Sequence, residues 1–118
     1  MQYVALIYTN ESEDQQMPPE QRESEMREYF ALNDHARSIG SHLGGEALQS
    51  TSTATSVRLR DGEMLLTDGP FAETAEALGG FYLFECEDLD AAIDLARRIP
   101  AARHGTVEVR PVMMLPKK

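Results

Sequence analysis

Two turn signals divide the centre of the chain and constrain its fold more than any other feature. Asp61-Gly62 follows the alternating run Thr55 to Arg60 and predicts a tight hairpin turn, because a type I′ turn needs positive φ at both central residues. Gly69-Pro70 then ends the return strand Glu63 to Thr67, since Gly adopts positive φ and Pro cannot donate to a sheet ladder. Another hydrophobic run, Phe81 to Cys86, follows this turn. The middle of the chain is therefore predicted to hold three strands.

The segments on either side of this centre add helices and strands. Gln2 to Tyr8 predicts a strand covered on both faces, because both of its alternating sets are apolar. A polar loop is predicted from Thr9 to Gln16, and a short strand from Glu46 to Gln49. Asp88 is a suitable N-cap for a helix that Pro100 stops. The last predicted strand runs from Thr106 to Val112.

A long helix is predicted to begin at Pro18-Pro19, since Pro is tolerated in a first helical turn. Gly44-Gly45 is predicted to end it, because Gly adopts the left-handed conformation of a helix C-terminus. Three- and four-residue steps mark one apolar stripe as its buried face: Met26, Tyr29, Phe30, Ala36, Ile39 and Leu43.

The resulting order is β-α-β-(β-hairpin)-β-α-β, in one domain over residues 1–118. This order predicts an α+β fold, a ferredoxin-like β-α-β-β-α-β sheet with its helices on one face only. The other face also carries apolar residues from several strands. We therefore predict a homodimer that packs two sheets face to face.

The charge balance excludes several classes of partner. The chain has 11 basic and 20 acidic residues, a net charge of −9. This argues against nucleic acid, whose phosphates need a basic face, and against an anionic membrane surface.

The single Cys86 cannot form an internal disulfide and suits a reducing cytoplasm. No signal peptide or membrane span is visible, and no metal site or cofactor is predicted.

Several segments of the chain resemble one family. They are Tyr3-Val4-Ala5-Leu6-Ile7-Tyr8, Asp68-Gly69-Pro70-Phe71-Ala72-Glu73, Leu78-Gly79-Gly80-Phe81-Tyr82, Asp88-Leu89-Asp90-Ala91-Ala92 and Val107-Glu108-Val109-Arg110-Pro111-Val112. Together they are similar to YCII-related proteins of the DGPF type. The resemblance implies a dimeric α/β-barrel of ferredoxin-like subunits and a bacterial cytoplasmic protein. It also implies a functional link to extracytoplasmic-function sigma factors, beside whose genes such proteins are often encoded.

The resemblance further implies a His–Asp pair in a cleft, with Asp68 as the acid. The family's histidine lies in an Arg-x-x-His-Leu pattern on the first helix, but the predicted helix starts Arg22-Glu23-Ser24-Glu25-Met26. His35 and His42 fall elsewhere on the predicted helix, and His35 is the candidate catalytic histidine. The structural alternative for Asp68 is a cap that accepts bonds from the backbone N–H groups of Phe71 or Ala72. His104 is interpreted as a loop histidine.

Three further residues are candidates for ligand binding. Phe71 and Tyr82 would line a cleft wherever the sheet face is open, and are otherwise core or interface residues. Arg110 could bind an anionic group, or could instead form a cross-strand ion pair.

These residues support two hypotheses. The first is a dimeric small-molecule-binding protein, with Asp68 in a cleft between sheet and helix and with proton-transfer or isomerase chemistry by analogy of fold. The second is a non-catalytic interaction module that acts with an extracytoplasmic-function sigma factor. A cavity where Asp68, Arg110 and a histidine converge would favour the first, and exposed apolar patches outside a dimer would favour the second.

Overall fold

A computed structural model of the chain describes residues 1–116. It has an α+β architecture with a four-stranded antiparallel sheet, a separate two-stranded hairpin and three helices. The strands are β1 Gln2–Thr9, β2 His42–Ala47, β3 Thr55–Arg60, β4 Glu63–Asp68, β5 Ala77–Glu85 and β6 Thr106–Pro111. The helices are α1 Glu11–Gln15, α2 Pro19–Ser38 and α3 Leu89–Ala96, with short 3-10 segments η1 Thr51–Thr53 and η2 Pro100–Arg103.

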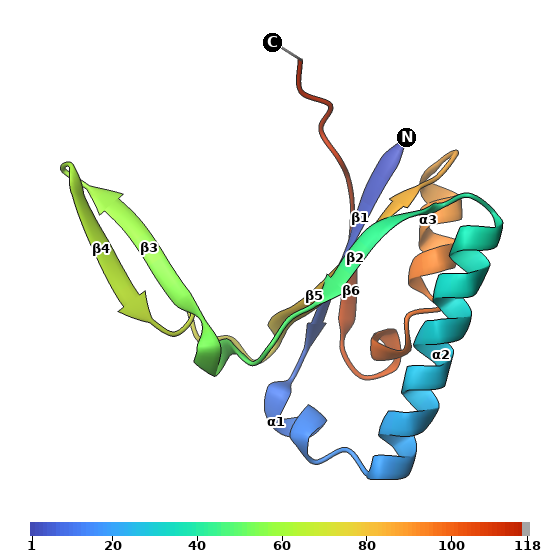
Figure 1. Cartoon of the computed structure of the whole chain (residues 1–118), viewed down its shortest axis with the longest axis horizontal. Helices are drawn as coiled ribbons and strands as arrows, with labels where there is room; N and C mark the ends of the chain where they lie inside the picture. Colours follow the sequence, from blue (N-terminus) through green and yellow to red (C-terminus); the bar gives the residue numbers. More distant parts are fainter. Residues whose placement is uncertain (117–118) are drawn as a thin grey trace.

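The main sheet has the strand order β2-β5-β1-β6, and every neighbouring pair is antiparallel. Figure 1 shows α2 and α3 on one side of this sheet, with the β3–β4 hairpin extending away on the other. The predicted ferredoxin-like α+β fold is therefore confirmed. None of the helices within residues 1–116 has both the length and the apolarity needed to cross a bilayer.

The core lies between the sheet and the helices, and strict alternation in the central strands builds it. Tyr3, Ala5 and Ile7 of β1 are buried, whereas the residues between them are half-buried on the opposite face. Tyr82 and Phe84 of β5 stack in this core with ring centroids 5.1 Å apart. The helices contribute mainly aliphatic side chains: Leu32, Ala36, Ala92 and Leu95.

The prediction that the long helix ends at Gly44-Gly45 was wrong. Helix α2 ends at Ser38, and Gly40 adopts the left-handed conformation with φ of +72°. His42 consequently lies on β2, where the chain pairs with β5, and not on a helix. Gly45 is needed there, since a Cβ atom at this position would lie 2.7 Å from the Phe81 carbonyl oxygen. Strand pairing, rather than helix capping, therefore explains Gly45.

The buried stripe of α2 is also rotated from its predicted position. Glu25, Leu32 and Ala36 are buried and Tyr29 is partly buried, so the inner positions follow steps of four, three and four. Met26 and Phe30, which were predicted to be buried, are 54% and 59% exposed. Helix α2 thus turns a carboxylate, Glu25, toward the sheet.

The segment Thr9 to Gln16 was predicted to be a loop, but it contains the short helix α1. The Asn10 side chain caps this helix by accepting a bond from the Glu13 backbone N–H at 3.0 Å. This capped turn fixes the direction in which Asp14 leaves the backbone.

The central hairpin forms as predicted. Asp61 and Gly62 both have positive φ, at 53° and 78°, as a type I′ turn requires. The hairpin stands apart from the main sheet (Figure 1), and Ser56 is the one position of β3 and β4 that is not exposed.

Candidate functional site

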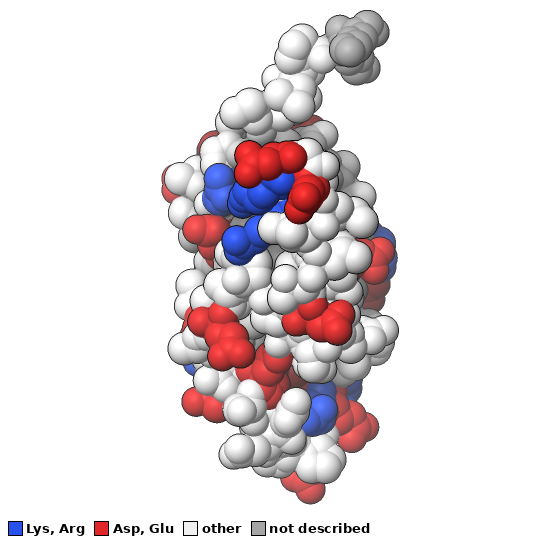
Figure 2. Space-filling view, turned by 90° about the vertical axis from the view of Figure 1, so that its left-hand side faces the viewer, with Lys and Arg blue, Asp and Glu red and all other residues white. Residues whose placement is uncertain are grey.

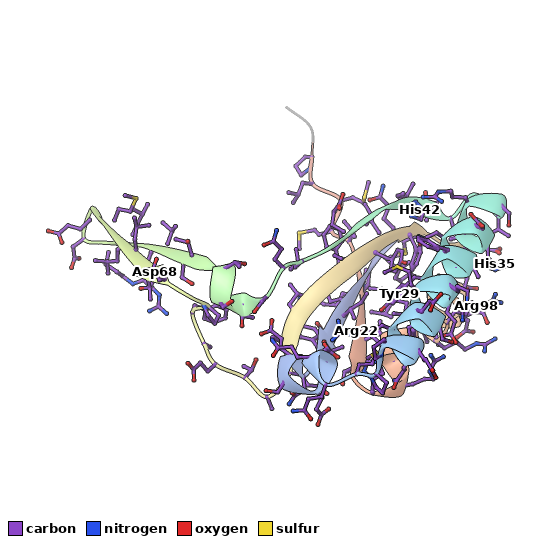
Figure 3. The ribbon with its side chains drawn as sticks, turned by 60° about the horizontal axis from the view of Figure 1, so that its bottom comes forward. Arg22, Tyr29, His35, His42, Asp68 and Arg98 are labelled. Carbon is purple, nitrogen blue, oxygen red and sulfur yellow. The ribbon has the colours of Figure 1, made fainter. Side chains whose placement is uncertain are left out.

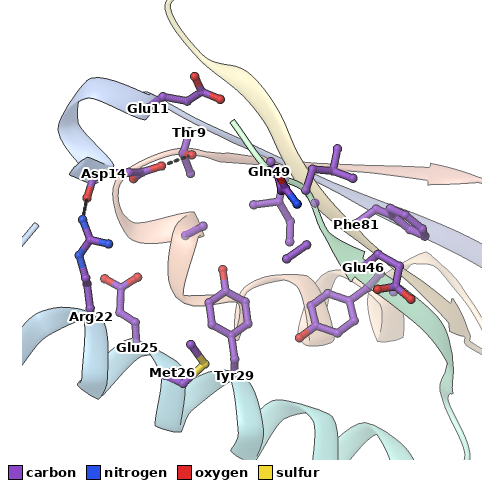
Figure 4. Close-up of a pocket in the computed structure, with 18 of the residues that line it drawn as sticks. Thr9, Glu11, Asp14, Arg22, Glu25, Met26, Tyr29, Glu46, Gln49 and Phe81 are labelled. Atoms are coloured by element: carbon purple, nitrogen blue, oxygen red, sulfur yellow. Dashed lines mark hydrogen bonds between the residues drawn. The ribbon is translucent and has the colours of Figure 1, made fainter. Parts of the chain in front are cut away.

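An open groove of about 770 Å³ lies between α2 and the end of the main sheet. Its walls come from β1, α1, α2, β2, β5 and the chain following η2, and the close-up in Figure 4 looks into it. Gly79 and Gly80 of β5 line it without side chains, which leaves room above the strand. A Cβ atom on Gly80 would lie 2.9 Å from the Glu46 carbonyl oxygen, so close pairing with β2 also requires this glycine.

One side of the groove holds a histidine between two carboxylates. The His104 Nε2 atom lies 3.1 Å from Glu25 Oε1, and its Nδ1 atom lies 4.0 Å from Asp14 Oδ1. Glu25 is 8% exposed, whereas the His104 side chain is 29% exposed and reachable from the groove. Three separate elements, α1, α2 and the loop after η2, meet to make this Asp14–His104–Glu25 cluster.

Neighbouring hydrogen bonds fix both carboxylates. The Thr9 hydroxyl donates to Asp14 Oδ2 at 2.5 Å, and the Gln21 amide donates to Glu25 Oε2 at 3.2 Å. Arg22 donates from its guanidinium to the Asp14 backbone carbonyl at 2.8 Å, which ties α1 to the start of α2 (Figure 4). The two acids are therefore oriented before any ligand enters.

Tyrosines form the next part of the wall. Tyr29, one helical turn after Glu25, points its hydroxyl into the groove (Figure 4). Burial raises the pKa of Tyr29 to about 12, and the charges of Tyr82, Glu25 and Asp14 add to this effect, while the Ala101 backbone opposes it. Tyr29 therefore keeps its proton at neutral pH and can donate a hydrogen bond.

Tyr82 is oriented by its neighbours. Its hydroxyl donates to Asn33 Oδ1 at 2.7 Å, and its ring meets the His42 ring edge-on with centroids 6.1 Å apart. Burial raises the pKa of Tyr82 as well.

The arrangement can move a proton. A glutamate carboxylate only accepts hydrogen bonds, so a neutral His104 that donates to Glu25 carries its N–H on Nε2. Nδ1, 4.0 Å from Asp14, is then left as the basic nitrogen, and Tyr29 is a nearby donor. Within residues 1–116, no group of three or more histidine, cysteine or acidic side chains is placed to hold a metal ion.

The structure brings one of the predicted site residues to this groove, Tyr82. Asp68 ends β4 opposite Thr55, and Figure 3 shows it on the hairpin, far from Tyr29 and Arg22. Phe71 lies in the loop after β4 and is 79% exposed. A cleft between sheet and helix does exist, and in this chain by itself Asp68 is not among the residues that line it.

Arg110 and His35 also lie outside the groove lining. Arg110 is exposed on β6 and pairs with Val4, on the sheet face opposite to the helices. His35 is partly exposed on α2, near its C-terminal end (Figure 3). The convergence of Asp68, Arg110 and a histidine, which would favour the first hypothesis, is therefore not found within residues 1–116.

Sequence reasoning missed Asp14, Glu25, Tyr29 and His104 as a group. His104 is 79 positions from Glu25, and only the fold brings them together. One signal was available in the sequence. Glu25, Tyr29, Leu32 and Ala36 follow a regular helical spacing, which marks Glu25 as a charge on a buried face.

Comparisons with known proteins show which family the chain belongs to. The family model of the YCII-related domain matches residues 1–116. An uncharacterised protein of Rhizobium meliloti (strain 1021) is 40% identical over 117 residues, covering 97% of this chain and 94% of that protein. The chain therefore belongs to the YCII-related family.

Proposed function

We propose that this protein binds a small molecule in the groove between α2 and the sheet, and that His104 transfers a proton on that ligand. The observation that carries the proposal is the Asp14–His104–Glu25 cluster in the wall of a groove of about 770 Å³. Pockets of this size suit small ligands, and titratable groups gathered in a pocket are typical of functional sites.

Each residue has a proposed role. Nδ1 of His104 accepts the ligand's proton, because its Nε2–H is directed to Glu25. Asp14, 4.0 Å from Nδ1, stabilises the imidazolium that forms. Tyr29 donates a hydrogen bond to the oxygen on which negative charge develops. Proton abstraction beside a carbonyl group, as in an isomerase, is the reaction class that these roles fit.

We also propose that the protein is a cytoplasmic homodimer. In support, the sheet face opposite to the helices carries Val4 and Leu6 next to Leu83 and Phe81, with no helix above them. Face-to-face packing of two such sheets would bury these side chains. A single free cysteine, Cys86, is buried and suits a reducing compartment. Assignment to the DGPF type rests on the sequence Asp68-Gly69-Pro70-Phe71.

One observation favours the alternative, an interaction module acting with an extracytoplasmic-function sigma factor. The β3–β4 hairpin exposes several large apolar side chains away from the groove. A module of this kind would need the hairpin but not His104, so the two functions depend on different residues.

A thermal-shift screen of a metabolite library tests the groove, because a ligand at one hundred times its Kd adds about 2.7 kcal/mol to stability. For any compound that raises the Tm of the wild-type protein, we expect His104→Asn to weaken binding about tenfold, by loss of one hydrogen bond to the ligand. His35→Asn, which changes a histidine outside the groove, is the matched control and should leave the Kd unchanged. Equal affinities for all three proteins would disprove the role of His104.

A further inference from the structure

The β3–β4 hairpin, residues 55–68, here named the arm, has one face of exposed apolar side chains. The register pairs Val57 with Leu66 and Leu59 with Met64, so these four side chains share one face. They are 60%, 60%, 67% and 62% exposed, respectively. The other face carries Arg58 opposite Leu65 and Arg60 opposite Glu63. The arm is therefore amphipathic, with one apolar and one largely charged face.

An arm of this kind needs a partner surface. A two-stranded hairpin alone in water is marginally stable, and requires packing of its apolar face on other elements. Bonds at its base fix where the arm starts: Gly69 N–H donates to the Ala54 carbonyl at 2.7 Å and Ser56 Oγ donates to the Gly69 carbonyl at 2.9 Å. These two bonds do not cover the apolar face, so Val57, Leu59, Met64 and Leu66 remain exposed.

The surface area of the chain is large for its mass. The chain exposes 8625 Å², whereas a compact monomer of 13.2 kDa exposes about 6,400 Å². Its radius of gyration is 16.4 Å, against about 13.5 Å for a compact chain of this length. The surplus of roughly 2,200 Å² exceeds the roughly 800 Å² per partner that a standard interface buries. Such an excess is typical of a chain that folds together with a second one.

The position of the arm indicates that this second chain is another copy. The arm rises on the side of the sheet opposite to the helices, the same side as the uncovered apolar sheet face (Figure 1). Seen from the arm side, basic groups cluster with acidic ones on the outward surface (Figure 2), which agrees with an apolar face turned toward the body. One copy related by a two-fold axis would cover both apolar surfaces at once, and its own arm would do the same in return.

We propose that the arm is a clasp, whose apolar face Val57, Leu59, Met64 and Leu66 packs against a second copy of this chain. The inference rests on the homodimer proposed above, and adds that the arm crosses to the other subunit. Leu65 and Leu66 are adjacent on β4 but lie on opposite faces of the arm, and so provide a matched pair for a test.

The test is the dimer dissociation constant, measured by sedimentation equilibrium for wild type, Leu66→Asp, Leu65→Asp and Leu6→Asp, with circular dichroism to check folding. Leu66→Asp should weaken the dimer at least a hundredfold and Leu65→Asp by less than threefold. Leu6→Asp, on the uncovered sheet face, should weaken it as well. A dimer broken by Leu6→Asp but insensitive to Leu66→Asp overturns the clasp and leaves the homodimer standing. A wild-type protein that is monomeric at micromolar concentration overturns both.

A photo-cross-linking amino acid at position 59 gives a second readout that needs no destabilising change. In purified protein mixed from ¹⁵N-labelled and unlabelled chains, we expect cross-linked peptides that join one labelled and one unlabelled chain. Cross-links confined to a single chain would overturn the proposal, since the arm would then fold back onto its own body.

Discussion

Glu25 is the residue that most distinguishes this core from an ordinary packed interior. A buried carboxylate is costly unless hydrogen bonds satisfy it. Here both oxygens are satisfied, by Gln21 at 3.2 Å and by His104 at 3.1 Å. A leucine at this position would pack without such support, so the carboxylate is better explained by what it does to His104 than by stability.

The sequence predicts Tyr82 as a pocket residue but not His104, and the reason is physical. Tyr82 lies on a strand whose apolar run is visible locally, whereas His104 contacts Asp14 and Glu25, which are far away in the chain. A local pattern favoured Asp68 as a site residue, because it is an acid at a strand end beside an aromatic residue. Asp68 pairs with Thr55 at the base of the hairpin, and the whole hairpin leaves the main sheet, which no local pattern reveals.

Tyr29 gives a prediction on pH dependence. Because burial raises its pKa to about 12, the folded state keeps the phenol proton after the unfolded chain has lost it. The contribution of the Tyr29 phenol to the free energy of unfolding is fully present below pH 10 and is lost as the pH rises toward 12. Denaturant unfolding gives the free energy of unfolding at pH 9 and at pH 11.5. The decrease between these two pH values should be smaller for Tyr29→Phe than for wild type, by roughly 1 kcal/mol after allowance for partial exposure. Equal losses in both proteins would show that Tyr29 is not buried as described.

At the scale of elements, helix starts were predicted better than helix ends. The Asp88 cap and the start of α3 are confirmed, because a cap depends on a side chain within three residues of it. The end of α2 was wrong, because Gly40 and Gly44-Gly45 all permit a helix to end. Pairing of the chain after Gly40 with β5 decided between them, and that pairing is a long-range interaction.

The Asp88 cap supports a prediction of stability. Its carboxylate accepts a bond from the Ala91 backbone N–H at 2.9 Å. Asp88→Ala should lower the free energy of unfolding by about 1 kcal/mol, since it leaves that N–H without its cap. Glu87→Ala removes a neighbouring charge of the same sign but does not remove a cap. It should lower the free energy of unfolding much less. Urea unfolding at one fixed protein concentration compares them, and equal midpoints for the two variants would contradict the capping role.

At the scale of the whole molecule, the order of elements is enough to predict the fold. The groove and the position of the arm become visible only in the three-dimensional structure. Two helical segments placed between strands predict the ferredoxin-like sheet with helices on one face, and the structure has it. The hairpin residues were each assigned correctly to β3 and β4, yet their local pattern does not say whether a hairpin packs on the main sheet or leaves it. The chain consequently has two distinct regions, a groove that suits a ligand and an arm that suits a second copy.

The location of the ligand can be measured directly, by ¹H–¹⁵N correlation spectra of the protein titrated with a compound from the thermal-shift screen. We predict that the amide signals of Tyr29, Gly80 and His104 move, while those of Asp68 and Gly69 stay unchanged. Movement confined to the loop after Asp68, or no movement in the groove at saturating compound, would contradict the proposal that this groove is the functional site.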